Sequence, residues 1–438
     1  MQRTLTLFAL MISAGASLLP AQEVVFFDQK GGEKLARMIP HLFGPNGIIL
    51  PNDFHSAHFE SDFIQQSFTP VNTAIGTQIA TLPFASPGSG FVYDFNSAAG
   101  VYQRSSESFG PILTERAETI GRRKLYIGFS YQYFAFDKVD GVDLNSFPGI
   151  LHHEQETGAP YEKDIITTRS DIDLKINQFT AVATYGLTDR LDISAAIPLV
   201  NAHFGLVSNA TIQRVAPPDP RFGQAHYFDP NAPNTSTQAV YAMNNNATGI
   251  GDVSFRVKWA VFRGERAAIS LLGDVRAPTG DALNFLGSGA LGVHPFVAFS
   301  YAARRFAPHV NVGYQWNGKS VLAGDVLTGQ KGNLPDAVTY AAGFDIPATR
   351  HITLAADLLG QRLFNATRVV PGSFTDPLGR TFPETTLEKG GLNLVSGAVG
   401  AKVNISRTLL VSGNLIFRLN DAGLTAPVVP LIGVSWTF

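Results

Sequence analysis

From residue 124 to residue 438 the sequence falls into twelve segments in which apolar and polar residues alternate. A period of two is what a β-strand shows when its two faces meet different surroundings. In one segment, for example, Phe255 and Val257 alternate with Arg256 and Lys258. Each segment reaches the roughly 9–11 residues that a tilted membrane-spanning strand needs. The segments lie at about 124–136, 171–186, 190–206, 250–262, 267–278, 289–302, 306–316, 336–346, 351–364, 391–405, 408–419 and 426–438.

The connections between these segments are short and long in alternation. The five connections after the even-numbered segments are tight turns, at 186–189, 263–266, 303–305, 347–350 and 406–407. Those after the odd-numbered segments are long at 137–170, 207–249, 317–335 and 365–390, and shorter at 279–288 and 420–425. A bacterial outer-membrane barrel has short periplasmic turns and long external loops, whereas a soluble sandwich has no reason to sort its connections in this way. We therefore predict an all-β fold, an antiparallel transmembrane β-barrel of 12 strands over residues 124–438.

The composition agrees with this prediction. Only 16% of the residues are charged, and the chain contains 42 Gly and 32 Phe. No stretch after the N-terminus approaches the roughly 18 consecutive apolar residues of a spanning helix. The absence of cysteine excludes disulfides, a lipid anchor and thiolate metal sites. A net charge of −2 gives no electrostatic argument for nucleic acid as a partner, and we predict no cofactor.

Residues 1–21 read as a signal peptide. Arg3 provides the positive start, Leu5–Leu19 are almost wholly apolar, and Pro20 to Gln22 offer a cleavage point. A small-x-small pattern at Ala14–Ala16 is a second candidate for the cut. The sequence therefore predicts export to the outer membrane of a Gram-negative bacterium.

Residues 22–123 do not follow the barrel pattern. They suggest a short helix at 33–42, a weakly amphipathic stretch at 59–82, and a β-hairpin made of 90–95 and 101–109. Three interpretations remain open for this leader segment. It forms a periplasmic cap or flexible leader, it folds inside the barrel as a plug, or its hairpin joins the wall to give 14 strands.

Two local features refine the predicted strands. The second segment changes phase near Asn177 and Gln178, which we interpret as a β-bulge. Trp259, Trp316 and Trp436 lie near strand ends on the outward parity, where membrane barrels carry an aromatic girdle.

Charged residues in the strands share the inward parity. An Arg or Lys that faces lipid at mid-depth costs about 2–4 kcal/mol, whereas one that faces the lumen does not. These residues form either a neutralised network that fills the barrel or a selective path for a ligand. The tight turn between the fourth and fifth segments lets Arg256 or Lys258 approach Asp274 across the strand pair. The inward set is Asp252, Arg256, Lys258, Asp274, Arg276, Asp357, Lys402 and Arg418.

Several motifs resemble sites without the context that a site needs. Gly287–Gly292 matches GxGxxG, but it lies in a predicted external loop with no following helix to bind a phosphate. A loop cluster of His and Glu lacks fixed spacing to other metal ligands. His294 and His309 are interpreted as packed or hydrated lumen residues, and we predict no catalytic residue and no metal site. The loop cluster is His152, His153, Glu154 and Glu156.

Two resemblances add to this reading. The alternating C-terminal strand with Trp436 and the terminal Phe438 resembles the assembly signal of outer-membrane proteins, which implies the barrel assembly machinery as a partner. The segments Thr188–Asp192, Gly249–Asp252 and Pro278–Asp281 resemble the outer-membrane barrel family of the meta-pathway of phenol degradation. That family is a distant relative of the long-chain fatty acid transporters, so the resemblance implies transport of hydrophobic compounds across the outer membrane.

We predict a barrel that admits small hydrophobic or aromatic molecules, with membrane lipid as its surroundings and no enzymatic activity. The nearest alternative is a general hydrophilic porin. A barrel enzyme that acts on lipid would need a nucleophile and a base close together in the lumen. A surface adhesin or purely structural barrel would carry its function in the loop at 207–249.

Overall fold

A computed structural model describes the chain from residue 33 to the C-terminus with gaps. The described residues are 33–44, 47–52, 59, 71–80, 82, 93–96, 101–104, 108–152, 163–215, 217–218, 223–406 and 408–438. The predicted signal peptide and three members of the loop cluster, His153, Glu154 and Glu156, lie outside them. Among the described residues, no helix has the length and apolar character needed to cross a membrane.

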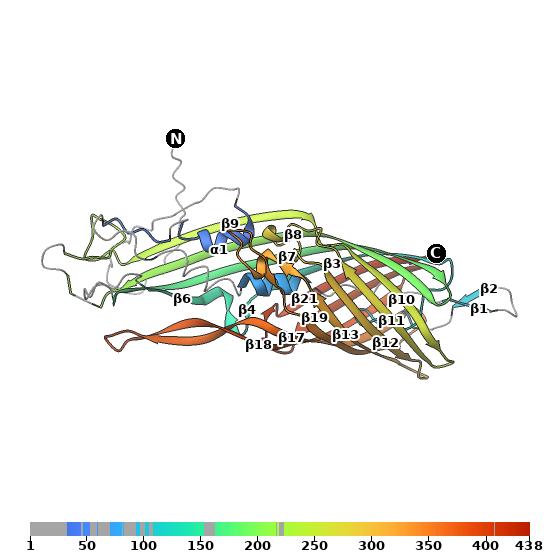
Figure 1. Ribbon diagram of the computed structural model, residues 1–438. Coiled ribbons are helices and arrows are strands. Elements are labelled where there is room, and N and C mark those ends of the chain that lie inside the picture. Colours follow the sequence, from blue (N-terminus) through green and yellow to red (C-terminus); the bar gives the residue numbers. More distant parts are fainter. Residues whose placement is uncertain are drawn as a thin grey trace.

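Twelve antiparallel strands close into a barrel, as the sequence predicts (Figure 1). Each strand pairs with its neighbours in sequence order, and the last strand, β21, pairs with the first, β3, so the wall has no free edge. The strands are β3 (Leu125–Phe136), β7 (Ile165–Thr188), β8 (Leu191–Gln213), β10 (Ser254–Arg263), β11 (Ala267–Arg276), β12 (Gly292–Tyr301), β13 (Ala307–Asn317), β16 (Ala337–Pro347), β17 (Ile352–Thr375), β18 (Thr381–Asn404), β19 (Leu409–Arg418) and β21 (Val428–Thr437).

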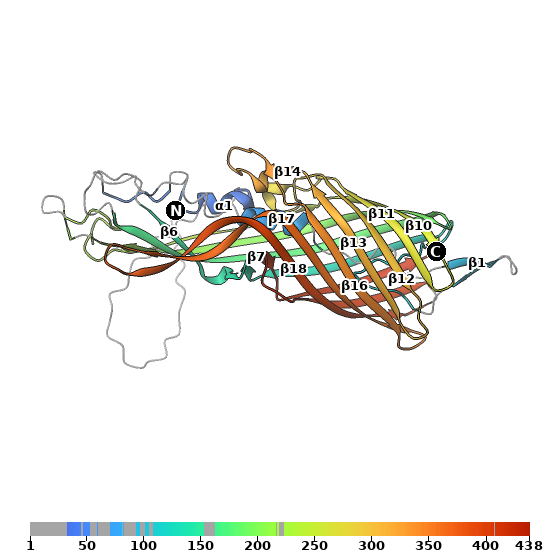
Figure 2. The same cartoon turned by 60° about the horizontal axis from the view of Figure 1, so that its bottom comes forward.

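Four of these strands continue beyond the membrane into regions that the sequence suggested as loops. β7 pairs with β8 as far as Ile165, and β17 pairs with β18 to the tip of their hairpin at Thr375 and Thr381 (Figure 2). Two further strands, β6 (Phe147–Leu151) and β9 (Gln238–Ile250), add to the outer parts of β7 and β8. The remaining short elements at this end are β4 (Lys138–Val139), β5 (Val142–Asp143), β14 (Lys319–Ser320), β15 (Gly332–Asn333), β20 (Leu424–Thr425), η1 (Leu144–Ser146), η3 (Ala282–Asn284) and η4 (Val321–Ala323).

The predicted bulge at Asn177 and Gln178 is wrong. β7 pairs with β3 without a register shift from Leu174 to Tyr185. The change of phase instead marks where β7 leaves the membrane. On the loop side of this point, toward Ile165, the inward residues are apolar and buried, as at Ile176, because they pack on other protein segments. On the turn side, toward Thr188, the inward residues are polar, as at Gln178, because the outward face now meets lipid.

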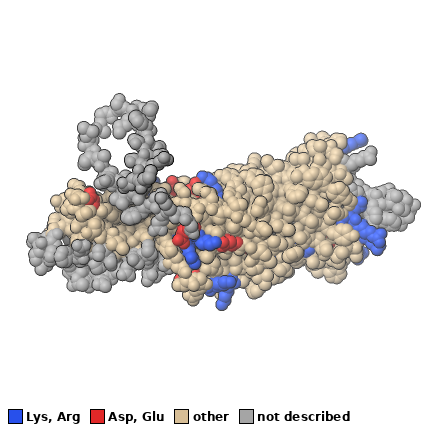
Figure 3. All heavy atoms as spheres, turned by 90° about the horizontal axis from the view of Figure 1, so that it is seen from above, with Lys and Arg blue, Asp and Glu red and all other residues tan. Residues whose placement is uncertain are grey.

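The outward residues of the barrel form an apolar surface. Phe255, Val257 and Trp259 of β10 are each about half exposed, with Trp259 at 53%. Figure 3 shows few charged side chains over the middle of the barrel and more toward its two ends. Trp259 lies near the turn end of β10 and Trp316 near the loop end of β13, which confirms their outward parity near strand ends. A protein with this surface is solvated by hydrocarbon, so the fold is a transmembrane barrel.

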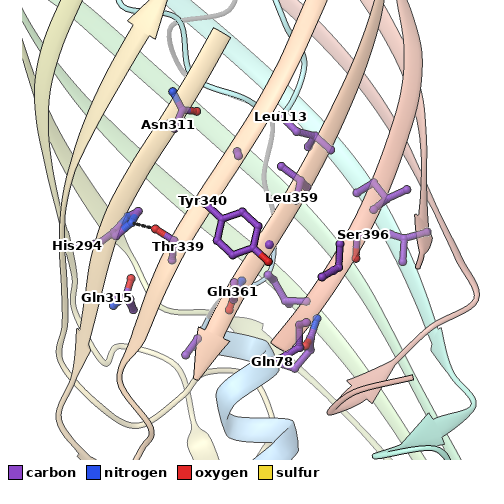
Figure 4. Close-up of a pocket in the computed structure, with 18 of the residues that line it drawn as sticks. Gln78, Leu113, His294, Asn311, Gln315, Thr339, Tyr340, Leu359, Gln361 and Ser396 are labelled. Atoms are coloured by element: carbon purple, nitrogen blue, oxygen red, sulfur yellow. Dashed lines mark hydrogen bonds between the residues drawn. The ribbon is translucent and has the colours of Figure 1, made fainter. Parts of the chain in front are cut away.

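The described parts of the leader lie at both ends of the barrel and within it. α1 (Leu35–His41) packs at the long-loop end, against β8, β9 and η3. The helix at 71–80 faces the lumen (Figure 4). β1 (Tyr93–Asn96) and β2 (Val101–Arg104) pair as the predicted hairpin, but they form a sheet of their own. The alternative of a 14-stranded barrel that includes this hairpin is therefore wrong.

The closing strand ends at the turn end of the barrel. The backbone N–H of Phe438 donates to the carbonyl of Leu125 (2.8 Å), and the N–H of Leu125 donates to the carbonyl of Phe438 (3.1 Å). The Phe438 side chain is 58% exposed, and it continues the outward row that contains Trp436. The terminal residue is thus part of the seam that closes the barrel.

Candidate functional site

An internal cavity of about 290 Å³ lies in the barrel lumen between two pieces of the leader. The helix at 71–80 borders it through Gln78 and Ala80, and the segment 108–121 borders it through Leu113 and Glu115 (Figure 4). Residues far apart in the sequence thus meet at one cavity, because both leader pieces lie within the ring of strands.

The cavity has two walls of different character. Strands β17 to β21 together with β3 provide mostly apolar side chains, whereas β10 to β16 provide charged and polar ones. The His294 ring stacks on Phe296 with centroids 4.7 Å apart and hydrogen-bonds to Thr339 Oγ1 (2.7 Å). Apolar members are Phe134, Phe136, Leu359, Leu394, Ile416 and Val429, and polar members are Arg256, Asp274, His294, Asn311, Gln315 and Thr339.

A buried charge cluster joins the polar wall to the leader. Arg256 donates to both oxygens of Asp274 (2.6 and 2.7 Å) and to Glu115 Oε2 (2.6 Å). Lys258 forms an ion pair with the other Glu115 oxygen and donates to the Arg116 carbonyl (3.0 Å). The approach of Arg256 to Asp274 agrees with the pairing of these residues across β10 and β11. Glu115 supplies the second carboxylate, and sequence reasoning missed it because no strand pattern reaches this position.

Arg276 borders the cavity, and Asp252 lies behind it as its partner. Asp252 accepts hydrogen bonds from the N–H (2.8 Å) and the hydroxyl (2.6 Å) of Ser288, and its carboxylate lies 3.5 Å from Arg276 Nε. Arg276 donates to Asn317 (3.0 Å) and to the carbonyl of Ala80 in the leader helix. The GxGxxG match is therefore a structural loop bound by Asp252, and the element that follows it is strand β12.

The segment 108–121 is bound by side chains of the barrel wall through its backbone. Lys402 donates to the carbonyls of Phe109 (3.1 Å) and Pro111, and Asp357 accepts from the Thr114 hydroxyl (2.6 Å). Wall side chains also accept from leader N–H groups, in the pairs Phe109 to Thr353, Leu113 to Asp357, Glu115 to Asn311, Ala117 to Ser300 and Ile120 to Asp192. Inward charges on distant strands thus converge on one strip of leader.

Arg418 differs from the other predicted residues because it lies toward the loop end of the lumen. It pairs with Asp137, and its Nε is 3.1 Å from Asp421. Lys138 donates to the Asp421 carboxylate (2.7 Å), and this hydrogen bond holds the pKa of that carboxyl below its usual range. The structure therefore does not join Arg418 to the Arg256 cluster, although both border the same cavity.

A buried chain of hydrogen bonds through Ser300, His309 and Asp345, here called the relay, was not predicted from the sequence. His309 Nδ1 lies 2.8 Å from Ser300 Oγ, and His309 Nε2 lies 2.5 Å from Asp345 Oδ1. Ser300 and His309 are direct partners across β12 and β13, so the tight turn and the shared inward parity could have identified the pair. The relay fastens the leader at two points, because Ser300 binds the Ala117 N–H and Asp345 accepts from Ser108.

The described residues contain no group of three or more His, Cys, Asp or Glu side chains that could hold a metal ion. Of the predicted loop cluster only His152 is described. It lies 3.8 Å from Glu384 and packs edge-on against Phe374.

Comparison with known proteins supports the family resemblance. The family model described as "Putative MetA-pathway of phenol degradation" matches residues 157–368, which confirms the resemblance over the central strands. No curated protein matches the sequence.

Several solved structures have similar folds. An outer membrane channel from Pseudomonas putida F1 is 14% identical and matches 74% of this chain and 98% of its own, with a TM-score of 0.44. A FadL homologue of Pseudomonas aeruginosa is 10% identical over 82% of this chain and 98% of its own, with a TM-score of 0.33. CymD, a monoaromatic hydrocarbon channel, is 9% identical over 72% and 89%, with a TM-score of 0.32.

At these identities and TM-scores, the barrel assignment depends on the strand pairing of this chain itself. The closed ring of strands and the apolar outer surface define an integral protein of the bacterial outer membrane.

Proposed function

We propose that this protein is a channel through which small hydrophobic or aromatic molecules cross the outer membrane. The observation that carries the proposal is the lumen cavity, which has one mostly apolar and one mostly polar wall. Cavities that bind small molecules are mostly apolar and contain a few convergent polar groups that orient the ligand. An aromatic molecule with one polar substituent fits this division, with its ring toward Leu359 and its substituent toward Gln315 or Thr339.

The leader acts as a plug in this proposal. The strip 108–121 is fastened to several strands around the wall, and Arg276 binds the helix at 71–80. A general hydrophilic porin would need a continuous aqueous path, and in a barrel of only twelve strands the described leader residues that border the lumen cavity would narrow such a path. Transport therefore requires at least part of the leader to move.

The inward charges serve mainly to hold this plug. Asp357 and Lys402 bind leader backbone, and Arg256 and Lys258 bind Glu115. Arg256 and Asp274 also border the cavity, so they contact a ligand there as well.

The protein acts without catalysing a reaction in this proposal. Ser300, His309 and Asp345 have the hydrogen-bond order of a hydrolase triad, and this is the observation that favours the barrel-enzyme alternative. However, Ser300 Oγ accepts the Ala117 N–H, and the Ser300 residue is only 1% exposed. A substrate must be able to reach a catalytic nucleophile, and here the leader backbone at Ala117 occupies the space next to Ser300 Oγ.

Filling the cavity should reduce transport of an aromatic compound. Leu359→Trp places a larger ring in the apolar wall, so uptake of a neutral aromatic compound should fall by about tenfold, as expected when a bound ligand loses about 1.4 kcal/mol. Leu358→Trp is the matched control, because the neighbouring side chain is 41% exposed on the outward, lipid-facing side. Uptake by whole cells measures the effect. Equal uptake by the two variants would show that the ligand does not pass through this cavity.

Phe438 is proposed to act, with Trp436, as the signal for assembly. Deletion of Phe438 should leave export intact but reduce the amount of membrane-inserted, heat-modifiable barrel, because the seam to Leu125 loses two backbone hydrogen bonds and the terminal aromatic ring. Gel mobility of heated and unheated membrane fractions measures this. Normal insertion of the shortened chain would contradict the assigned role.

A further inference from the structure

Every short turn of the barrel carries arginine. The five turns join β7 to β8, β10 to β11, β12 to β13, β16 to β17 and β18 to β19. In sequence order they contain Arg190, Arg263, Arg266, Arg304, Arg305, Arg350 and Arg407. The same stretches contain only two acidic residues, Asp189 and Glu265. We call these seven arginines the arginine collar.

Five of the six described collar residues are placed for contact with the surroundings, whereas Arg263 is half-buried and donates to the Asp189 carbonyl (2.6 Å). Arg190, Arg266, Arg304, Arg305 and Arg350 are all exposed. Figure 3 shows blue side chains gathered at the end of the molecule that carries the C-terminus, with no red among them. The leader adds exposed Arg122 and Arg123 at the same end, where the N–H of Arg123 binds the carbonyl of Gly186 (2.7 Å).

The collar lies directly beyond an aromatic row that faces lipid. Phe262 precedes the β10–β11 turn, and Tyr301 and Phe306 flank Arg304 and Arg305. All three aromatic side chains are exposed. Aromatic belts lie at the depth of the lipid headgroups, and strands advance about 3.3 Å per residue. The guanidinium groups are therefore within a few residues of the depth at which phosphate groups lie.

The cations also concentrate around one hollow. A cavity of about 310 Å³ is bordered by Arg263 and Arg266 of one turn, by Arg304 and Arg305 of a second, and by Arg116 of the leader. Its acidic lining residues are fewer, namely Glu118, Glu265 and Asp345, and Asp345 pairs with His309. Arginine is suited to phosphate because its planar guanidinium donates two parallel hydrogen bonds to two oxygens.

We propose that the arginine collar binds the phosphate groups of anionic phospholipids in the periplasmic leaflet of the outer membrane. A lipid is favoured over an acidic protein because exposed arginines lie in the four turns that hold the described collar residues, and because exposed aromatic residues lie next to them in the strands. A protein partner would need a patch on one side of the barrel. Bound lipid would fix the depth and tilt of the barrel at its turn end.

Lipid preference at the turn end tests the proposal. The full chain carrying W316F keeps Trp259 and Trp436, which both lie near the turn end. It is folded into vesicles that contain brominated phosphatidylglycerol or brominated phosphatidylcholine, whose bromine atoms quench tryptophan fluorescence on contact. Brominated phosphatidylglycerol should quench the tryptophan fluorescence more than brominated phosphatidylcholine does, which would show a preference for the anionic lipid. This difference in quenching should decline as salt is added. Each cation near an anionic surface strengthens binding about fivefold, so R304Q with R305Q should weaken the preference by about 25-fold.

The matched control neutralises two exposed lysines at the loop end, K319Q with K331Q, and should keep the preference. Soluble glycerol phosphate should not compete, which separates a lipid surface from a site for free phosphate. The single variant R350Q is a milder change, and it should lower the preference even if the double variant folds poorly. An unchanged preference in the folded collar variants would overturn the proposal. So would a wild-type protein with equal affinity for the two lipids, and an acidic protein partner would then be the reading to test.

Discussion

Replacing Val257 with Arg is expected to destabilise the folded barrel by about 2–4 kcal/mol in lipid vesicles. Val257 lies in the middle of β10 with half of its side chain exposed on the outer face, so the guanidinium would enter the hydrocarbon. Unfolding by urea after insertion into vesicles measures the change in free energy.

Ser254→Arg in the same strand is the matched control. Ser254 has the opposite parity and borders the internal cavity, so an arginine there can remain hydrated and can approach Asp274 or Glu115. We expect Ser254→Arg to lose much less stability than Val257→Arg. Similar losses in the two variants would mean that the parity of β10, and with it the register of the neighbouring strands, is wrong.

Replacing Glu115 with Gln should release the leader from the polar wall. Glu115 is 3% exposed and pairs with both Arg256 and Lys258, so the change leaves Lys258 buried without its carboxylate partner. Breaking a buried pair in this way typically costs about 3–5 kcal/mol. Because the cost applies to the proposed plugged state, we expect more frequent open-channel events in planar bilayers and faster proteolysis of the leader.

Glu118→Gln is the control for the Glu115 variant. Glu118 is only partly buried, and its backbone carbonyl, which the substitution keeps, is what Lys258 contacts (3.3 Å). This variant should retain the low conductance of the wild type. If the Glu115 variant conducts no more than the Glu118 variant, the charge cluster does not hold the plug.

The sequence predicted the barrel because each strand satisfies one repeated physical constraint. An outward residue such as Val257 must suit lipid, and an inward residue such as Arg256 must not meet it, so the period of two reports the wall directly. The same constraint explains the error at Asn177 and Gln178. Outside the membrane the inner face of β7 packs on protein, so the apolar parity is reversed although the strand continues unbroken.

The candidate site was less predictable because it depends on contacts between distant parts of the chain. Arg256 and Asp274 could be paired from the tight turn that joins their strands, and the structure places them together. The contact of Glu115 with Arg256 could not be predicted, since the leader has no periodic pattern that fixes where it meets the wall. The pairing of Ser300 with His309 was within reach of the same turn argument, whereas the contact of His309 with Asp345 required the closed barrel.

The most direct test of the account compares uptake of two compounds by cells that produce the protein and cells that lack it. A small neutral aromatic compound probes the proposed path, and a small sugar of similar mass probes an open aqueous pore. We expect faster uptake of the aromatic compound and no change for the sugar, because the lumen contains a partly apolar cavity and the leader is proposed to close it at rest. Equal gains for both compounds would contradict it in favour of a hydrophilic porin, and no gain for the aromatic compound would contradict transport altogether.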